Sequence, residues 1–82
     1  MDIVPSGALI VLKNSDVPGV IGRVGTILGN HKINIGEYHQ ARLSKGGQAL
    51  AAIAVDGEVD QAVRDALLEL PEVSAAVVVH LD

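Results

Sequence analysis

The sequence contains no cysteine, tryptophan or phenylalanine, and Tyr38 is its only aromatic residue. Without cysteine there is neither a disulfide framework nor thiolate chemistry. A single aromatic ring offers no platform on which nucleobases could stack. Six lysines and arginines against ten acidic residues leave a net charge of −4. These absences exclude the usual nucleic-acid-binding surfaces.

Long apolar segments are also missing. The runs Ala8–Leu12 and Ala75–Val79 are far too short to cross a bilayer. The opening Met1–Gly7 has no basic stretch followed by a long apolar one, so we expect no signal peptide and a cytoplasmic location. What the sequence does contain is aliphatic, because 49% of its 82 residues are hydrophobic. This composition predicts one small domain with a core of Val, Ile, Leu and Ala.

Hydrophobic periodicity divides the chain into six elements. Apolar residues in short consecutive or alternating runs indicate strands, whereas apolar residues three and four positions apart indicate amphipathic helices. The expected elements are a strand over Ala8–Lys13, a helix over Gly19–Asn30, a strand over Ile33–Leu43, a strand over Gln48–Val55, a helix over Val59–Leu70 and a strand over Val73–Leu81. The order βαββαβ predicts an α+β, ferredoxin-like plait, in which two helices cover one face of a four-stranded antiparallel sheet.

Turn residues support these boundaries. Pro18 suits the first turn of the first helix, where its missing N–H removes no hydrogen bond. Lys45-Gly46-Gly47 has the composition of a hairpin turn, and Pro71 halts the second helix. The first and last strands carry apolar residues on both faces, but two helices can cover only one. The apolar residues on the uncovered face predict contact with another molecule, and we expect a dimer.

Four glycines interrupt the apolar pattern of the first helix: Gly19, Gly22, Gly25 and Gly29. Their spacing matches neither G-x-G-x-x-G nor G-x-x-x-x-G-K-[ST], so a nucleotide-binding loop is not indicated. Glycine lowers helix stability, and its repeated use therefore needs a reason. We expect these positions to allow a close approach of the helix to the sheet or to a neighbouring subunit.

The ionisable residues form no recognisable catalytic or metal site. His31, His39 and His80 lack the spacing of metal ligands, and no metal is expected. Glu37 and His39 lie on the same face of a strand, where we expect a solvated or interface pair. No serine stands beside a plausible base, so we expect no catalytic residue in this chain.

The stretch Lys13-Asn14-Ser15-Asp16-Val17-Pro18-Gly19 has more polar groups than a turn requires. The N–H groups at a helix start are unpaired, and the helix dipole adds partial positive charge there, so a carboxylate can bind without a cationic side chain. Asp16 could receive an ammonium group, and Asn14 offers a donor and an acceptor. Alternatively, Asp16 is a plain N-cap and Asn14 a turn residue at a strand end. Spacing alone leaves both interpretations open.

The run N-S-D-V-P-G-V-I-G-R-V-G-T-I-L-G, followed by I-N-I-G-E-Y-H-Q-A-R, resembles the ACT domain, a small amino-acid-sensing module. The resemblance covers essentially the whole chain. Within the family it is strongest to the C-terminal, serine-binding regulatory domains of D-3-phosphoglycerate dehydrogenases. It implies a parent enzyme that uses NAD, with no cofactor in this domain.

The resemblance also implies a ligand site. In the family, two domains join their sheet edges into one sheet of eight strands, and serine binds in the seam between them. The matching side chains are Asn14, Asp16 and Asn34, the last from the partner copy. The matching backbone groups belong to Val17, Pro18, Gly19, Val20 and Ile35. By their chemistry, the amides of Gly19 and Val20 suit the ligand carboxylate, Asp16 suits the ammonium group, and Asn34 suits the hydroxyl or a bridge between chains.

Two residues depart from the family pattern. Asn14 stands where some members have histidine, and it cannot titrate. Lys32 stands where glycine is common, which requires either Asn30 as the left-handed residue or a different helix cap. The alternatives to the serine-sensing enzyme tail are an ACT domain of an L-serine dehydratase subunit, a free-standing amino-acid sensor and a domain that only dimerises. A small acylphosphatase-like enzyme would need an arginine-bearing phosphate loop, whereas this loop carries Asp16.

Overall fold

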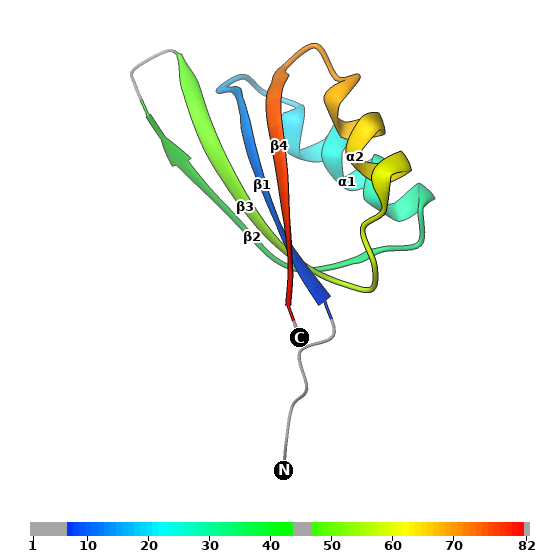
Figure 1. Cartoon of the computed structure of the whole chain (residues 1–82). Coiled ribbons are helices and arrows are strands. Elements are labelled where there is room, and N and C mark those ends of the chain that lie inside the picture. Colours follow the sequence, from blue (N-terminus) through cyan, green and yellow to red (C-terminus); the bar gives the residue numbers. More distant parts are fainter. Residues whose placement is uncertain (1–6, 44–46, 82) are drawn as a thin grey trace.

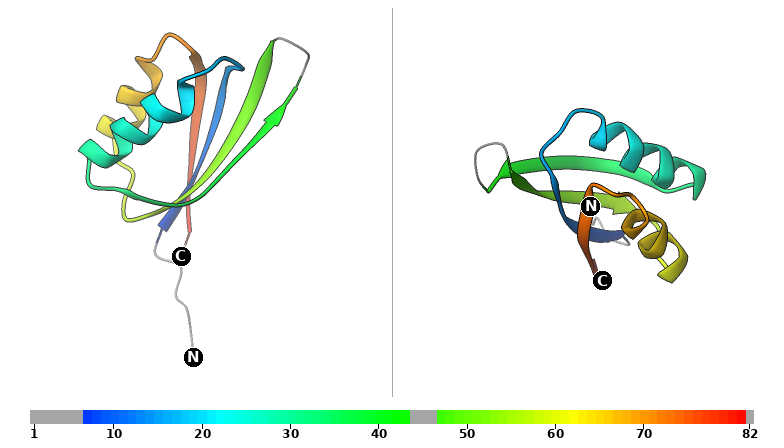
Figure 2. Two further views of the ribbon diagram at one scale, coloured as in Figure 1. Left: turned by 180° about the vertical axis from the view of Figure 1, so that it is seen from behind. Right: turned by 90° about the horizontal axis from the view of Figure 1, so that it is seen from above.

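The computed structural model describes residues 7–43 and 47–81. Over these residues the chain forms the predicted βαββαβ order (Figure 1). The elements are β1 (Gly7–Ser15), α1 (Val20–Asn30), β2 (Asn34–Arg42), β3 (Gln48–Asp56), α2 (Gln61–Leu68) and β4 (Val73–His80). The strands form one antiparallel sheet in the order β2-β3-β1-β4, and both helices lie on the same face of it (Figure 2). The predicted ferredoxin-like plait is confirmed.

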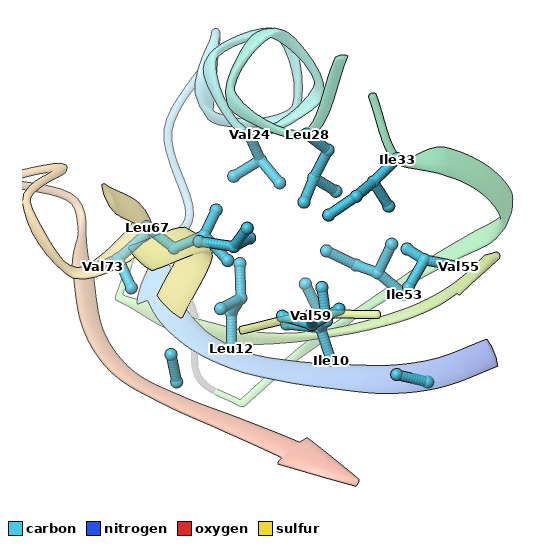
Figure 3. Packing of buried hydrophobic residues seen from close by; sticks show 14 of the residues in the cluster. Ile10, Leu12, Val24, Leu28, Ile33, Ile53, Val55, Val59, Leu67 and Val73 are labelled. Carbon is cyan, nitrogen blue, oxygen red and sulfur yellow. The ribbon is translucent and has the colours of Figure 1, made fainter. Parts of the chain in front are cut away.

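The core is aliphatic, as the composition predicts, and it fills the space between the sheet and the helices (Figure 3). In β1 the alternate residues Ala8, Ile10 and Leu12 are fully buried. Val24 and Leu28 of α1 are also fully buried above them. Removing such side chains from water supplies the main favourable free energy of a domain this small.

The sheet face opposite the helices carries exposed apolar residues near β4. Leu9 pairs with Val79, and Val11 with Val77, across β1 and β4. Val77 and Val79 remain 56% and 46% exposed. The apolar character predicted for both faces of β1 and β4 is therefore present, although the contact that would cover it stays a prediction.

The first helix begins one residue later than the spacing predicts. Gly19 is the N-cap, and its φ of 92° lies in the left-handed region. Pro18 therefore precedes the N-cap, and its expected place inside the first helical turn is wrong. The sharp left-handed turn at Gly19 sets the direction in which α1 leaves the sheet.

The helical glycines do not serve the expected approach to the sheet. A Cβ atom at Gly22, Gly25 or Gly29 would meet nothing within 4 Å in the described part of the chain. Close packing of α1 onto its own sheet is therefore the wrong explanation for these three positions. The approach of a neighbouring subunit stays a prediction.

The C-terminus of α1 resolves the question raised by Lys32. Lys32 itself adopts the left-handed conformation, with φ 61°. Its N–H donates to the Gly29 carbonyl at 3.0 Å, and the Ile33 N–H donates to the Leu28 carbonyl at 2.9 Å. These two bonds form a Schellman motif, in which glycine normally occupies the position of Lys32. Asn30 ends the helix as an ordinary helical residue, so of the two alternatives left open by the sequence the different cap is the one that forms.

Other boundaries differ from the predicted ones by one or two residues. The second strand begins at Asn34, and Ile33 lies before it as a buried core residue. The helix α2 is shorter than the apolar spacing predicts, because Asp60 caps its start by accepting the Val63 N–H at 3.1 Å. The predicted turn Lys45-Gly46-Gly47 falls mostly outside the described residues.

Candidate functional site

The candidate site is the mouth of α1, where the loop after β1 enters the helix. No side chain of the described residues caps the start of α1. Its first N–H groups are therefore left for solvent or a ligand, and they carry the positive end of the helix dipole. A side chain at Gly19 would be strained by its φ of 92°, and its Cβ would lie 2.9 Å from Nη1 of Arg23. Glycine at this position avoids both the strain and the clash with Arg23.

Asp16 lies beside the mouth, but it does not cap the helix. Its Oδ2 accepts from Nε of Arg42 at 2.6 Å, and its Oδ1 accepts from Nε2 of Gln40 at 3.2 Å. The Asp16 side chain is only 14% exposed, whereas that of Arg42 is 76% exposed. The interpretation of Asp16 as a plain N-cap is wrong. Its carboxylate instead ties the loop after β1 to the C-terminal end of β2.

Asn14 is a fully buried residue of β1 and not a turn residue at the strand end. It lies between Ala49 of β3 and Val73 of β4 in the sheet. Its Nδ2 donates to the carbonyl of Ser15 at 2.9 Å, while its Oδ1 is buried and meets no donor among the described residues. A buried acceptor without a donor costs about 1–3 kcal/mol, so this oxygen is a candidate partner for a bound water or ligand.

Asn34 and Ile35 lie at the opposite end of the sheet from Asp16. Asn34 pairs with Asp56 at the end of β3, whereas Arg42 pairs with Ala49 near its start. Eight residue steps along β2 separate Asn34 from Arg42, which is about 26 Å for an extended strand. Within one chain the predicted site residues therefore form two separate groups.

The structure adds one charged group that the sequence interpretation missed. The guanidinium of Arg23 lies over Gly19 and forms an ion pair with Glu72, which follows α2. Glu72 keeps one buried carboxylate oxygen, Oε1, without a donor among the described residues. Arg23 stands four residues after Gly19, one helical turn away, and that spacing was the available signal.

Glu37 and His39 lie in solvent on β2. Nε2 of His39 lies 3.8 Å from Oε1 of Glu37, and both side chains are more than 70% exposed. The expected pair of Glu37 and His39 is therefore present. Across residues 7–43 and 47–81, no three His, Asp or Glu side chains gather as a possible metal site. Within the same ranges, no helix has the length and apolar character needed to cross a membrane.

The βαββαβ order and the antiparallel sheet define a small ferredoxin-like domain, with a polar loop at the start of α1. The chain belongs to the ACT domain family, whose profile matches residues 8–72. It is 33% identical over 81 residues to D-3-phosphoglycerate dehydrogenase of Bacillus subtilis and 32% identical over 81 residues to that of Methanocaldococcus jannaschii. Each match covers 99% of this chain but only 15% and 16% of the two relatives.

Two other similarities extend this comparison. A probable L-serine dehydratase beta chain of Bacillus subtilis is 36% identical over 66 residues, covering 80% of this chain and 30% of the relative. The solution structure of the C-terminal domain of the MgtC protein from Mycobacterium tuberculosis superposes with a TM-score of 0.71. That match covers 98% of this chain and 92% of the other at 12% identity, and it therefore supports the fold alone.

Proposed function

We propose that this ACT domain is the serine-sensing regulatory part of a D-3-phosphoglycerate dehydrogenase. The hydride-transfer chemistry and the NAD that it uses would belong to other domains of that oxidoreductase. The proposal is supported by relatives of this name that match 99% of the chain, and by the uncapped mouth of α1. The uncapped helix start is the main support, because its free N–H groups and the helix dipole can bind a carboxylate without a cationic side chain.

The ligand site would be shared between two copies of the chain. In the described part of the sheet, β2 is an edge strand with β3 on one side only. Two β2 edges that pair antiparallel about Tyr38 would bring Asn34 of one copy opposite Arg42 of the other. Arg42 holds Asp16, so this pairing would join the two separated groups of site residues. Ile35 on this edge strand is 39% exposed, and Val17, next to Asp16 in the chain, is 47% exposed, so apolar surface remains to be covered.

Each group of the ligand then has a complementary partner. The N–H groups of Gly19 and Val20 would bind the carboxylate of serine, with Val17 and Pro18 shaping the approach. Asp16 would share its charge between Arg42 and the ligand ammonium group, and Asn14 Oδ1 would accept from the ligand or from a bridging water. Asn34 and the backbone of Ile35 from the second copy would close the site and bond the serine hydroxyl.

Regulation would follow from binding across the seam. Serine would hold two copies in one arrangement and so favour one arrangement of the domains attached to them. A coupling free energy of about 1–3 kcal/mol is typical for such effects and is sufficient for feedback control.

The similarity to the L-serine dehydratase beta chain supports a second candidate. In that case the same site would sense serine for an enzyme that degrades it. Both candidates share the ligand and differ in the attached enzyme.

The test is calorimetry of serine binding to the 82-residue chain, repeated with Asn34→Ala. We expect serine affinity to fall by about tenfold, because one hydrogen bond to a polar ligand group is lost. Asn30→Ala is the matched control, since Asn30 is an exposed asparagine at the far end of α1. Unchanged affinity in Asn34→Ala, with the dimer intact, would reject the assigned site. If a panel of the twenty amino acids showed another one binding in place of serine, the ligand assignment would change to that amino acid.

A further inference from the structure

Glu37 and His39 lie on the sheet face opposite the helices. They pair with Ala54 and Ala52 of β3, and these alanines alternate with the core residue Ile53. Residues that pair across strands share a face, so Glu37 and His39 lie on the uncovered side. There Nε2 of His39 lies 3.8 Å from Oε1 of Glu37. The two side chains therefore stand together above a surface of small residues.

A β-bulge at Gly36 sets the orientation of Glu37. Ile35 pairs with Val55, whereas Glu37 pairs with the next residue along β3, Ala54, so Gly36 is the extra residue of β2. Without the bulge, Ile35 and Glu37 would share one face of the strand. Bulges of this kind are common at sheet edges beside functional sites, where they re-aim a side chain. Here the bulge leaves Ile35 on the side of the core and turns Glu37 outward.

In one chain this pair supplies only two of the four ligands that a zinc ion usually takes in a protein. In the described part of the sheet, β2 is an edge strand (Figure 1). The antiparallel pairing about Tyr38 proposed above would place Glu37 of each copy opposite His39 of the other, because both residues are one step from Tyr38. The cluster therefore depends on the same seam as the proposed function. Spacing along the sequence could not reveal it, since half of its residues belong to the second copy.

The dimensions and chemistry of this cluster fit a zinc ion. Opposite Cβ atoms are about 5 Å apart and alternate ones on a strand about 7 Å apart, so each lies about 4 Å from the centre of the four. Both side chains can reach an ion above that centre with Zn–N and Zn–O bonds of about 2.0–2.2 Å. Imidazole nitrogen together with carboxylate oxygen is a ligand set of zinc, whereas magnesium and calcium take oxygen ligands. The two carboxylates also balance the charge of a divalent ion.

We propose that the seam between two copies binds one zinc ion, through Nε2 of His39 and a carboxylate oxygen of Glu37 from each copy. The ion lies on the two-fold axis, on the sheet face opposite the helices. Gln40 and Arg42 hold Asp16 on the other face, so the zinc site is separate from the serine sites. One ion links the two copies whether or not serine is bound, and it therefore strengthens the dimer.

The experiment is a calorimetric titration of the 82-residue chain with zinc chloride, after metal has been removed with EDTA. We expect one zinc per two chains, and a dimer that zinc stabilises against dilution in sedimentation equilibrium. His39→Ala and Glu37→Gln each remove one ligand from both copies and should weaken zinc binding at least about a hundredfold, because losing an outer-shell partner alone costs about 10–100-fold. His80→Ala is the matched control, since His80 is an exposed histidine on β4, at the other edge of the described sheet, and its loss should leave zinc affinity within about twofold.

The outcomes separate the zinc site from the serine site. One zinc per chain, unchanged zinc affinity in His39→Ala, or no zinc binding by a chain that dimerises would each overturn the proposal. A chain that stays monomeric at saturating zinc would overturn both this proposal and the shared serine site. In EDTA, Glu37→Gln should bind serine within about twofold of the parent, whereas Asn34→Ala should lose serine and keep zinc. Zinc binding without serine binding would therefore refute the ligand of the proposed function alone, and serine binding without zinc binding would refute the zinc site alone.

Discussion

Replacing Lys32 with glycine should stabilise the domain. Lys32 is the left-handed residue of the Schellman motif after α1, with φ 61°. A residue with a Cβ atom pays about 1–2 kcal/mol in this conformation, and glycine avoids that cost. Glycine also makes the unfolded chain more flexible, which returns about 0.4–1 kcal/mol. The net gain in unfolding free energy should be about 0.5–1 kcal/mol.

The gain can be measured by urea denaturation or thermal melting of the variant. A gain of this size raises Tm by about 5 °C in a domain of this length. Lys32→Ala keeps the Cβ atom and should leave stability nearly unchanged, which separates backbone strain from loss of the lysine side chain. Asn30→Gly places glycine inside the last helical turn and should destabilise slightly. A Lys32→Gly variant that is less stable than the parent, or an Asn30→Gly variant that is more stable, would refute the assignment of the left-handed residue.

The pKa of the Tyr38 phenol is raised above its ordinary 10.0 by burial. The stability that the neutral phenol contributes is therefore present below pH 10.0 and is lost as pH rises through the folded pKa, so the chain should unfold more easily in alkali. Tyr38→Phe should remove this part of the pH dependence. An absorbance titration in which Tyr38 of the folded chain titrates at its ordinary pKa would contradict this prediction. Leu28→Ala should lower the unfolding free energy by about 3 kcal/mol, because Leu28 is fully buried. A loss below about 1 kcal/mol in urea denaturation would contradict the burial of Leu28 in the core. Arg42→Ala should change stability by less than about 1 kcal/mol, because the ion pair with Asp16 is largely exposed on the Arg42 side, and a larger loss in the same assay would show a stronger structural role.

The fold could be predicted because its signals are local and repeated. Val24 and Leu28 recur at helical spacing, and Ile10 and Leu12 alternate with residues of the opposite face. Such periodicities follow from the geometry of a helix and a strand, and they need no knowledge of distant contacts. The order of the elements then left few possible topologies.

The details of α1 could not be predicted in the same way. Whether Pro18 or Gly19 begins the helix depends on the direction in which the loop crosses the sheet. At the other end, tertiary packing of Ile33 against the core outweighs the poor left-handed propensity of Lys32. Both outcomes depend on tertiary contacts that a single stretch of sequence does not contain.

The site was only partly predictable for the same reason. The polar loop was found from its composition, but the partners of Asp16 lie 24 and 26 residues further along the chain. The ion pair between Arg23 and Glu72 spans 49 residues. Long-range pairs of this kind follow from strand register and helix packing, and residue spacing does not encode them.

The central claim is that one serine site contains Asp16 of one copy and Asn34 of another. Its most direct test is serine calorimetry on an equal mixture of Asp16→Ala and Asn34→Ala chains, after unfolding and refolding together. Each variant alone has no complete site, but random pairing should restore about one quarter of the sites at parental affinity, since each mixed dimer contains one complete site. Recovery of that fraction is the predicted result. A mixture that binds no more serine than the separate variants would contradict the account.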